Sequence, residues 1–413
     1  MPTDEQAKTE EKVLAEARQR IKEVRQGDLV VRVVGPEKKP IVGAVVEVEQ
    51  TSSDFLFGCN IYAFDRFDDP ELDQAYKERF RELFNFATLP FYWAGYEPEQ
   101  GKPGYAYTDK VADWCRENGI VAKGHPLVWT HRAGLPKWLP SEPDLVTRLV
   151  ETRVTEVVTR YRGKIDLWDV VNEPIHTPAF GNWTTVEHVA APLRRARAAN
   201  PDAQLIVNEY YMFAREKDRA GFRKLLDDLV AAGAPFDAIG LQAHEPAHYR
   251  FSSGEVMDTL DAYADLGKPL HITEFVPASD GEPTRGLRHA PNWTEEEQAD
   301  FATTFYTLCF SHAAVEAITW WDLSEAKTWR KGGSLCREDM TPKPAYLALK
   351  KLIHEDWRTK RSGQTDGSGT FRVRGFTGDY ICRITVDGEI KESTTTLPRD
   401  GAECTVTVER PER

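Results

Sequence analysis

The chain alternates short apolar runs with amphipathic helical stretches over roughly 300 of its residues. Apolar runs bounded by turn residues are typical of buried strands, and their alternation with helices predicts a parallel sheet. Eight such units favour a closed (β/α)8 TIM barrel over an open sheet. The predicted strands are 55–60, 84–90, 120–125, 165–172, 205–208, 238–242, 270–274 and 317–321, and the helical patterns include 110–118, 145–161, 215–232, 295–312 and 345–353.

Both ends of the chain show a different pattern, in which apolar and polar positions alternate. Residues 29–34 and 42–49 flank a turn-rich segment and predict a β-hairpin. Further alternating runs follow a Gly/Ser-rich linker at 363–370. Because a few strands alone make a marginal unit, we hypothesise that both terminal segments pack into one small accessory β-sandwich. The C-terminal runs are 371–374, 380–386, 391–396 and 403–409.

These patterns predict an N-terminal helix and hairpin at 1–54, a catalytic barrel at 55–356 and a C-terminal β-strand module at 357–413. The accessory β domain can brace the barrel or bind sugar, and both roles stay open. Residues 1–26 are charged and helical in pattern, without the apolar core of a signal peptide. No run in the chain has the length needed to cross a bilayer.

Composition narrows the possible partners. The 53 Lys and Arg against 66 Asp and Glu residues give a net charge of −13, which repels nucleic-acid phosphates and anionic membranes. The 11 Trp, 14 Tyr and 19 Phe residues suit stacking on sugar rings or a large core. The six cysteines lack metal-ligand spacing, but Cys382 and Cys404 lie in neighbouring predicted strands and can form a disulfide.

Polar side chains end most of the predicted barrel strands. In a barrel those carboxyl ends converge on one mouth, where active sites form. Glu173 and Glu274 follow the fourth and seventh strands, so their carboxylates can face each other across that mouth. Glycoside cleavage needs such a pair, and a separation of about 5 to 5.5 Å makes it retaining. The other strand-end residues are Asn60, His125, Asn172, Asn208, Glu209, Gln242, His244, Trp321 and Asp322.

This pair also suits proton transfer. When Glu274 is ionised nearby, ionisation of Glu173 costs more free energy, so the pKa of Glu173 rises and it stays protonated near neutral pH. Once a sugar esterifies Glu274 the repulsion disappears, and Glu173 becomes the base for water. The alternative, two surface glutamates in ordinary salt bridges, fits poorly with strand ends in apolar surroundings.

The motifs around these glutamates resemble those of glycoside hydrolase family 10, the family of endo-β-1,4-xylanases. They span about 55–353 in the family's order, and this combination is specific although each motif alone is weak. The matching segments are Gly124-His125-Pro126-Leu127-Val128-Trp129, Trp168-Asp169-Val170-Val171-Asn172-Glu173-Pro174, Gln242-Ala243-His244, Ile272-Thr273-Glu274, and Trp321 with Trp329.

The resemblance implies a role for each matching residue. Glu173 is similar to the family's acid/base, Glu274 to its nucleophile, and Asn172 to the residue that hydrogen-bonds the sugar 2-hydroxyl. The histidines can instead be core residues and the tryptophans packing residues. The residues that the resemblance places around the sugar are His125, Trp129, Asn208, Tyr210, Gln242, His244, Trp321 and Trp329.

The sequence departs from the family after strand two. The family usually has Thr-Pro-Glu-Asn followed by Met-Lys-Trp, whose polar groups hold sugars, whereas residues 88–93 are Thr-Leu-Pro-Phe-Tyr-Trp. Tyr92 and Trp93 thus bring aromatic bulk to the expected sugar site. Since hydrogen-bonding groups discriminate strongly between substrates, their loss is expected to change the accepted sugar.

Two further departures lie near the histidine and tryptophan motifs. Val276 replaces the acidic residue expected to hold His244, so we expect a different orientation or protonation of this histidine. The loop after Trp129 is two residues longer than usual and introduces Arg132. This guanidinium can recognise a uronic acid or be an exposed loop side chain.

The residues favour a retaining β-glycosidase that cleaves a β-1,4-xylan-like plant polysaccharide or oligosaccharide, as a monomer without cofactor or metal ion. The altered segment at 88–93 leaves open an exo-acting or debranching glycosidase for a decorated or non-xylan glycan. Two other classes remain: a non-catalytic carbohydrate-binding barrel and, from the scattered histidines, a metal-dependent barrel hydrolase. A polymeric substrate favours a secreted or periplasmic location.

Overall fold

The computed structural model describes residues 3–287 and 290–409, which divide into two compact units. The helix α1 (Asp4–Val24) contributes to both of them. Within the described residues, no helix is both long and apolar enough to span a membrane. Unit 1 comprises 3–14, Leu56–Cys309 and Ala314–Leu347, and unit 2 comprises Ala15–Phe55, Phe310–Ala313 and 348–409.

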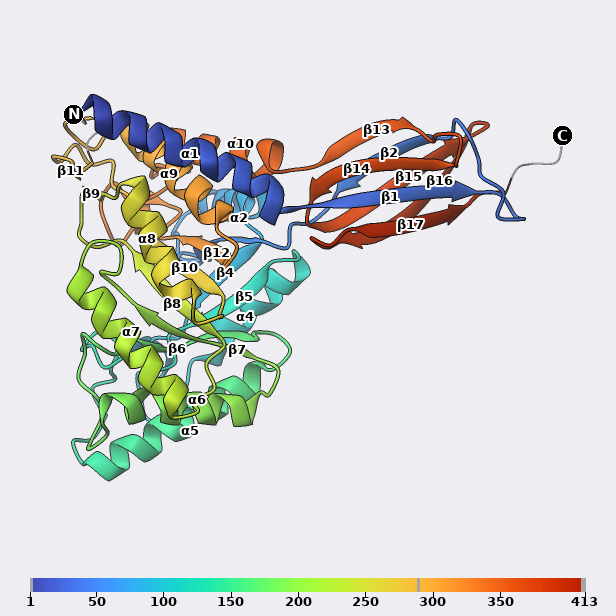
Figure 1. Cartoon of the computed structure of the whole chain (residues 1–413). Helices are drawn as coiled ribbons and strands as arrows, with labels where there is room; N and C mark the ends of the chain where they lie inside the picture. The colour runs from blue at the N-terminus through green and yellow to red at the C-terminus, as the bar shows by residue number, and fades with distance from the viewer. Residues whose placement is uncertain (1–2, 288–289, 410–413) are drawn as a thin grey trace. The chain divides into compact units, whose positions relative to one another are not determined.

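Unit 1 is a closed barrel of parallel strands with helices packed around it (Figure 1). The barrel strands pair in chain order and the last closes onto the first, which confirms the predicted (β/α)8 fold. The strands are β3 (Leu56–Asn60), β4 (Phe86–Pro90), β5 (Val121–His125), β6 (Leu167–Asn172), β7 (Gln204–Glu209), β8 (Ala238–Ala243), β10 (Leu270–Phe275) and β12 (Val315–Trp320).

The other elements of unit 1 follow the strands in the order expected for β/α units. A two-stranded sheet pairs β9 (Tyr249–Arg250) with β11 (Arg285–Gly286), and a 3-10 turn covers Glu325–Lys327. The α-helices are α2 (Pro70–Leu83), α3 (Trp93–Tyr96), α4 (Tyr105–Glu117), α5 (Pro143–Tyr161), α6 (Thr185–Ala199), α7 (Glu216–Ala231), α8 (Ser253–Ala264), α9 (Glu295–Ser311) and α10 (Pro344–Lys351). The last residues of α9 and α10 belong to unit 2, as does the π-helical turn (Leu352–Asp356) that follows α10.

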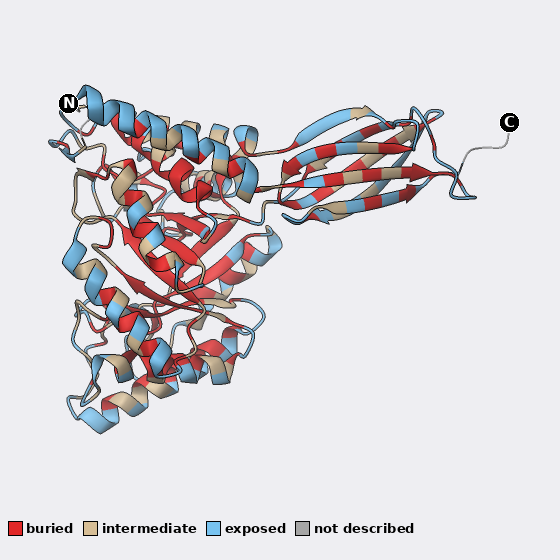
Figure 2. Cartoon of the chain, in the orientation of Figure 1, coloured by how far each residue is buried: buried red, intermediate tan, exposed pale blue. Residues whose placement is uncertain are grey.

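The barrel strands form continuous apolar runs because both of their faces are covered. All six residues of β8 and of β10 are buried, and Figure 2 shows the barrel strands almost wholly in the colour of buried residues. Helix α6 starts at a capping box, in which Thr184 accepts from the Glu187 N–H and the Glu187 carboxylate accepts from the Thr184 N–H. This cap fixes the residue at which the loop after β6 ends and α6 begins.

Unit 2 is a small β-sandwich built from both ends of the chain, as predicted. One sheet has the order β14-β1-β17 and the other β13-β2-β15-β16. Since the two sheets draw on residues before and after the barrel, neither end alone completes a sheet. The strands are β1 (Gln26–Val34), β2 (Val45–Gln50), β13 (Lys360–Gln364), β14 (Thr370–Phe376), β15 (Gly378–Val386), β16 (Glu389–Leu397) and β17 (Ala402–Thr407).

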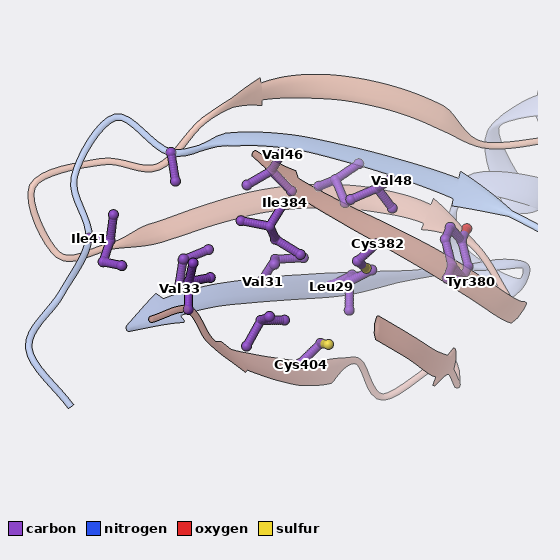
Figure 3. Packing of buried hydrophobic residues seen from close by; sticks show 14 of the residues in the cluster. Leu29, Val31, Val33, Ile41, Val46, Val48, Tyr380, Cys382, Ile384 and Cys404 are labelled. Atoms are coloured by element: carbon purple, nitrogen blue, oxygen red, sulfur yellow. The ribbon is translucent and has the colours of Figure 1, made fainter. Parts of the chain in front are cut away.

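The sandwich core lies between the inner faces of these sheets (Figure 3). Burial alternates along β1 and β15, so that Leu29, Val31 and Ile384 point inward while their neighbours are more exposed. Cys382 and Cys404 are part of this core, and both thiols are free in the structure. The alternation of apolar and polar residues in the sequence therefore predicts correctly which residues of these strands face the core.

Two predictions about this unit are wrong. β1 and β2 do not form a hairpin, because β1 pairs with β14 and β17 whereas β2 pairs with β13 and β15 in the facing sheet. Alternation identifies a one-sided strand but not its partner. The segment 363–370 is not a linker: its first residues end the polar edge strand β13, and its last residue starts β14.

The core position Ile384 and the exposed position Ile390 on the paired strand offer a matched test of sandwich packing. Ile384 is fully buried and Ile390 is 67% exposed. We expect Ile384→Ala to lower the free energy of local opening by about 2 to 4 kcal/mol because it leaves a cavity. Amide hydrogen exchange of β15 measures this loss, and Ile390→Ala serves as the near-neutral control. Equal effects of the two variants would contradict the assigned core.

Candidate active site

A cavity of about 640 Å³ lies at the carboxyl ends of the barrel strands. Its walls combine carboxylates, imidazoles and aromatic rings, the side chains that bind and cleave sugars. Most of the predicted site residues come together here. Those that line the cavity are Tyr92, His125, Trp129, Asn172, Glu173, Tyr210, His244, Glu274, Trp321 and Trp329.

Glu173 and Glu274 reach this cavity from opposite sides of the barrel. Glu173 follows β6 and has a φ of 57°, a left-handed backbone that is uncommon for a residue with a side chain. Its Oε2 accepts the indole N–H of Trp129 at 2.8 Å. Glu274 belongs to β10, is 6% exposed, and its Oε1 accepts the Asn208 amide N–H at 3.1 Å.

Amide side chains join the two carboxylates. Asn172 Oδ1 accepts from Asn208 Nδ2 at 2.8 Å and from Gln242 Nε2 at 3.1 Å. The same Gln242 nitrogen lies 3.4 Å from Glu173 Oε1, and Asn208 Nδ2 also reaches Glu274. Asn208 and Gln242 are thus behind the cavity wall, where they fix Asn172 and both glutamates rather than line the space.

Both carboxyl groups have raised pKa values. Burial raises the pKa of Glu173 to about 7, although the hydrogen bond from Trp129 favours its ionised form. Burial also raises the pKa of Glu274, and the charge of Glu173 raises it further. Burial therefore favours the protonated form of both carboxyl groups.

A buried charge pair supports the imidazole beside Glu274. Lys123 Nζ lies 2.8 Å from Asp169 Oδ2, and both side chains are fully buried. The same oxygen accepts the Nδ1–H of His125 at 2.7 Å, which leaves His125 Nε2 at 3.8 Å from Glu274 Oε1. Burial lowers the pKa of His125, so its Nε2 can accept a hydrogen bond from a sugar hydroxyl.

His244 has a different environment from the one its family motif implies. Val276 is buried and offers no carboxylate, but Glu245 Oε1 lies 3.7 Å from His244 Nδ1. Glu245 is paired with Arg330 at 2.7 Å. His244 Nε2 donates to Gln242 Oε1 at 2.6 Å, and burial lowers the pKa of His244. The neighbouring carboxylate therefore comes from the same loop as His244.

Aromatic rings form two walls of the cavity. Tyr92 contacts the rings of His125 and Trp129 at centroid distances of 5.5 and 5.6 Å. Tyr62 lies between Tyr92 and Trp321, at 5.8 and 5.4 Å. Tyr92 stands in the segment where the family's polar strand-two contacts were expected, so this wall presents mainly aromatic ring surface to the cavity.

Besides Asn208 and Gln242, the residues Trp93 and Arg132 highlighted from the sequence also lie outside the cavity lining. Trp93 is 5% exposed, donates its indole N–H to Glu97 and packs against Trp138. Arg132 is an exposed loop residue. Among the lining residues, the cation is Lys327, which follows β12.

Several lining residues were not singled out from the sequence. Tyr62, Tyr211 and Glu245 each lie two residues beyond the end of a strand, so reading further past each strand end finds them. Lys327 and His131 lie deeper in loops, where sequence spacing gives no such signal. In the part of the chain that the structure describes, no three His, Cys, Asp or Glu side chains are grouped to hold a metal ion.

The indole of Trp129 provides a direct test of the Glu173 environment. We expect Trp129→Phe to raise the pKa of Glu173 above about 7, because the lost N–H donor stabilises the ionised carboxylate. Carboxyl NMR titration measures the shift, with Glu173→Gln assigning the signal. Trp138→Phe, which removes an indole that donates to the Glu97 carbonyl, is the control. An unchanged or lower pKa in Trp129→Phe would contradict the assigned hydrogen bond.

The chain is similar in sequence to known proteins. Anti-sigma-I factor RsgI6 of Acetivibrio thermocellus is 30% identical over 386 residues, covering 91% of this chain and 47% of that protein. Endo-1,4-beta-xylanase 1 of Arabidopsis thaliana is 27% identical over 369 residues, covering 87% of this chain and 36% of that protein. The chain thus spans about half or less of the length of these two relatives.

A solved structure and a family model cover the barrel. Native xylanase 10B from Thermotoga maritima has a TM-score of 0.62 and 25% identity, over 73% of this chain and 96% of that chain. The model of glycosyl hydrolase family 10 matches residues 50–352, most of the chain. The chain therefore belongs to glycosyl hydrolase family 10.

Proposed function

We propose that this protein is a retaining β-glycoside hydrolase that cleaves a β-1,4-xylan-like chain by double displacement. The observation that carries the proposal is the pair of buried carboxyl groups, Glu173 and Glu274, joined through three amides in one cavity. Membership of family 10 and relatives named as endo-1,4-beta-xylanases support a glycan substrate.

In the first step the sugar is transferred to Glu274. Its carboxylate oxygen forms a bond to the anomeric carbon while the glycosidic C–O bond breaks, and the proton of Glu173 moves to the leaving oxygen. The raised pKa of Glu173, about 7, keeps that proton available near neutral pH. Asn172, held by Asn208 and Gln242, is placed to hydrogen-bond the sugar as positive charge develops on it.

In the second step water releases the sugar. The Glu173 carboxylate takes a proton from water, whose oxygen bonds to the anomeric carbon as the ester to Glu274 breaks. Esterification removes the charge of Glu274, so the pKa of Glu173 falls at the stage when it must act as a base. Two inversions at the same carbon give net retention of configuration.

A second candidate is an exo-acting or debranching glycosidase on a decorated or non-xylan glycan. It is favoured by the aromatic wall of Tyr62 and Tyr92, which lacks the amide, carboxylate and ammonium contacts expected after strand two. Because lost hydrogen-bonding groups relax or redirect specificity, the reaction can be kept while the sugar changes. The same two glutamates act in both candidates.

Azide rescue tests the roles of the two glutamates. Glu274→Ala is expected to lose roughly 10⁴-fold or more of turnover, and azide is expected to restore it with an inverted glycosyl azide as product. In Glu173→Ala, azide is expected instead to give a product of retained configuration, because it replaces water at the esterified sugar. Proton NMR of the products separates the two. Full activity of Glu274→Ala without azide would overturn the assignment.

Product analysis tests the substrate. The first candidate predicts a ladder of xylo-oligosaccharides from unsubstituted β-1,4-xylan, whereas the second predicts single sugars or no product from it. Chromatography against a set of defined plant oligosaccharides distinguishes these results. The Glu274→Ala variant is the control for contaminating activity. If another β-glycoside is cleaved and xylan gives no oligosaccharides, the xylan proposal is wrong.

A further inference from the structure

The loop that carries Glu173 is tied to the end of the next barrel strand by a fully buried carboxylate. Glu209, the last residue of β7, accepts the Ile175 N–H on Oε2 at 2.9 Å. Its other oxygen accepts the Tyr210 N–H at 2.9 Å and the Nδ1–H of His176 at 2.7 Å. Burial raises the pKa of Glu209, and the hydrogen bond and charge of His176 and the N–H groups of Ile175 and Tyr210 oppose that rise by stabilising the ionised carboxylate.

These hydrogen bonds of Glu209 help to stabilise the unfavourable backbone conformation of Glu173. The left-handed φ of 57° at Glu173 is disfavoured for a residue with a side chain. Upstream, the Glu173 N–H donates to the Asn208 carbonyl at 2.8 Å. Downstream, the Glu173 carbonyl accepts the N–H groups of His176 and Thr177 at 3.1 and 3.0 Å. Glu209 therefore holds the downstream half of the turn that directs Glu173 into the cavity.

His176 gives this carboxylate a cationic partner. Burial lowers the pKa of His176, but the hydrogen bond and charge of Glu209 outweigh burial, so this pKa is raised overall. Its ring also lies 4.1 Å from the ring of Tyr210, which lines the cavity. The other titratable or charged groups around His176 and Glu209 are Glu173, Asp218 at 3.7 Å from His176 Nε2, Tyr211 with Arg215 on its ring, and Tyr263.

Resting on the proposed acid/base role of Glu173, we propose that Glu209 and His176 form a positioning pair for this residue. Glu209 holds the turn at Glu173, and its negative charge favours the protonated form of the Glu173 carboxyl. His176 offsets part of that charge. The pair thereby sets the pKa of Glu173, and with it the highest pH at which this residue keeps its proton.

The sign of the expected effect follows from charge. The negative charge of Glu209 is one cause of the raised pKa of Glu173, after burial and against the Trp129 hydrogen bond. Activity is lost as pH rises through this pKa, because an ionised Glu173 cannot protonate the leaving oxygen. Removing the Glu209 charge must therefore move the basic limb of kcat/KM to lower pH, and removing only the His176 charge must move it to higher pH.

The experiment compares pH profiles of full-length Glu209→Gln and His176→Gln, using a xylo-oligosaccharide and an aryl glycoside with an activated leaving group. Glu209→Gln keeps an acceptor for the loop N–H groups but has no charge, so we expect its basic limb to fall by roughly half a pH unit or more. His176→Gln keeps a donor to Glu209 and is expected to shift the limb upward. Carboxyl NMR titration of Glu173 in both variants must show the same directions.

A matched control is His248→Gln, which breaks a histidine–carboxylate pair with Asp280 outside the cavity lining and is expected to leave the limb in place. An unmoved or raised limb in Glu209→Gln, or a lowered one in His176→Gln, would overturn the proposed pair. If azide still rescues Glu274→Ala in that case, only the role of Glu209 and His176 is wrong. Failure of azide rescue would instead count against the proposed function.

Discussion

The placement of two carboxyl groups, the partly buried Glu173 and the buried Glu274, in one cavity is the constraint that the surrounding structure must satisfy. Removal from water raises the pKa of both groups, and the charge of Glu173 raises that of Glu274 further. Such a site is stable only if the remaining lone pairs find donors. The indole of Trp129 and the amides of Asn208 and Gln242 are those donors.

The amide network also explains why the strands must end where they do. Asn172, Asn208 and Gln242 lie at or next to the carboxyl ends of three consecutive strands, β6, β7 and β8. A shift of one residue in any of these strands would turn its amide to the other face of the barrel wall. The register of the barrel strands therefore determines the geometry of the carboxylates.

The barrel and the centre of the site could be predicted because burial on both strand faces leaves a plain apolar signature, followed by polar residues at the mouth. The strands that pair with β1 and with β2 could not be predicted, because alternation reveals which face is buried but not which strand lies alongside. β13 was missed because its exposed residues Lys-Arg-Ser-Gly-Gln carry no apolar pattern. Its place in the sheet depends on backbone hydrogen bonds to β2, which any sequence can make.

The loop residues of the site were harder to predict for a similar reason. Lys327 lines the cavity from the 3-10 turn after β12, and Glu245, just past the end of β8, is held in place by Arg330, 85 residues away in sequence. The sequence around Glu245 does not predict such a distant contact. The position of Trp93 shows the opposite case, since a tryptophan beside the site is instead used to pack Glu97 and Trp138.

The proposed reaction chemistry and the proposed sugar recognition use different parts of this barrel, which is why one can change without the other. The carboxylates and their amide donors sit on strand ends whose backbone is fixed by pairing with neighbours on both sides. Tyr92 and Tyr62 instead follow the ends of β4 and β3, in loops where side chains can be exchanged without disturbing any barrel hydrogen bond. Aromatic replacement there alters the surface presented to a sugar while the strand-end carboxyl pair keeps its donors. The divergence of this chain from the family pattern is concentrated where the fold tolerates it best.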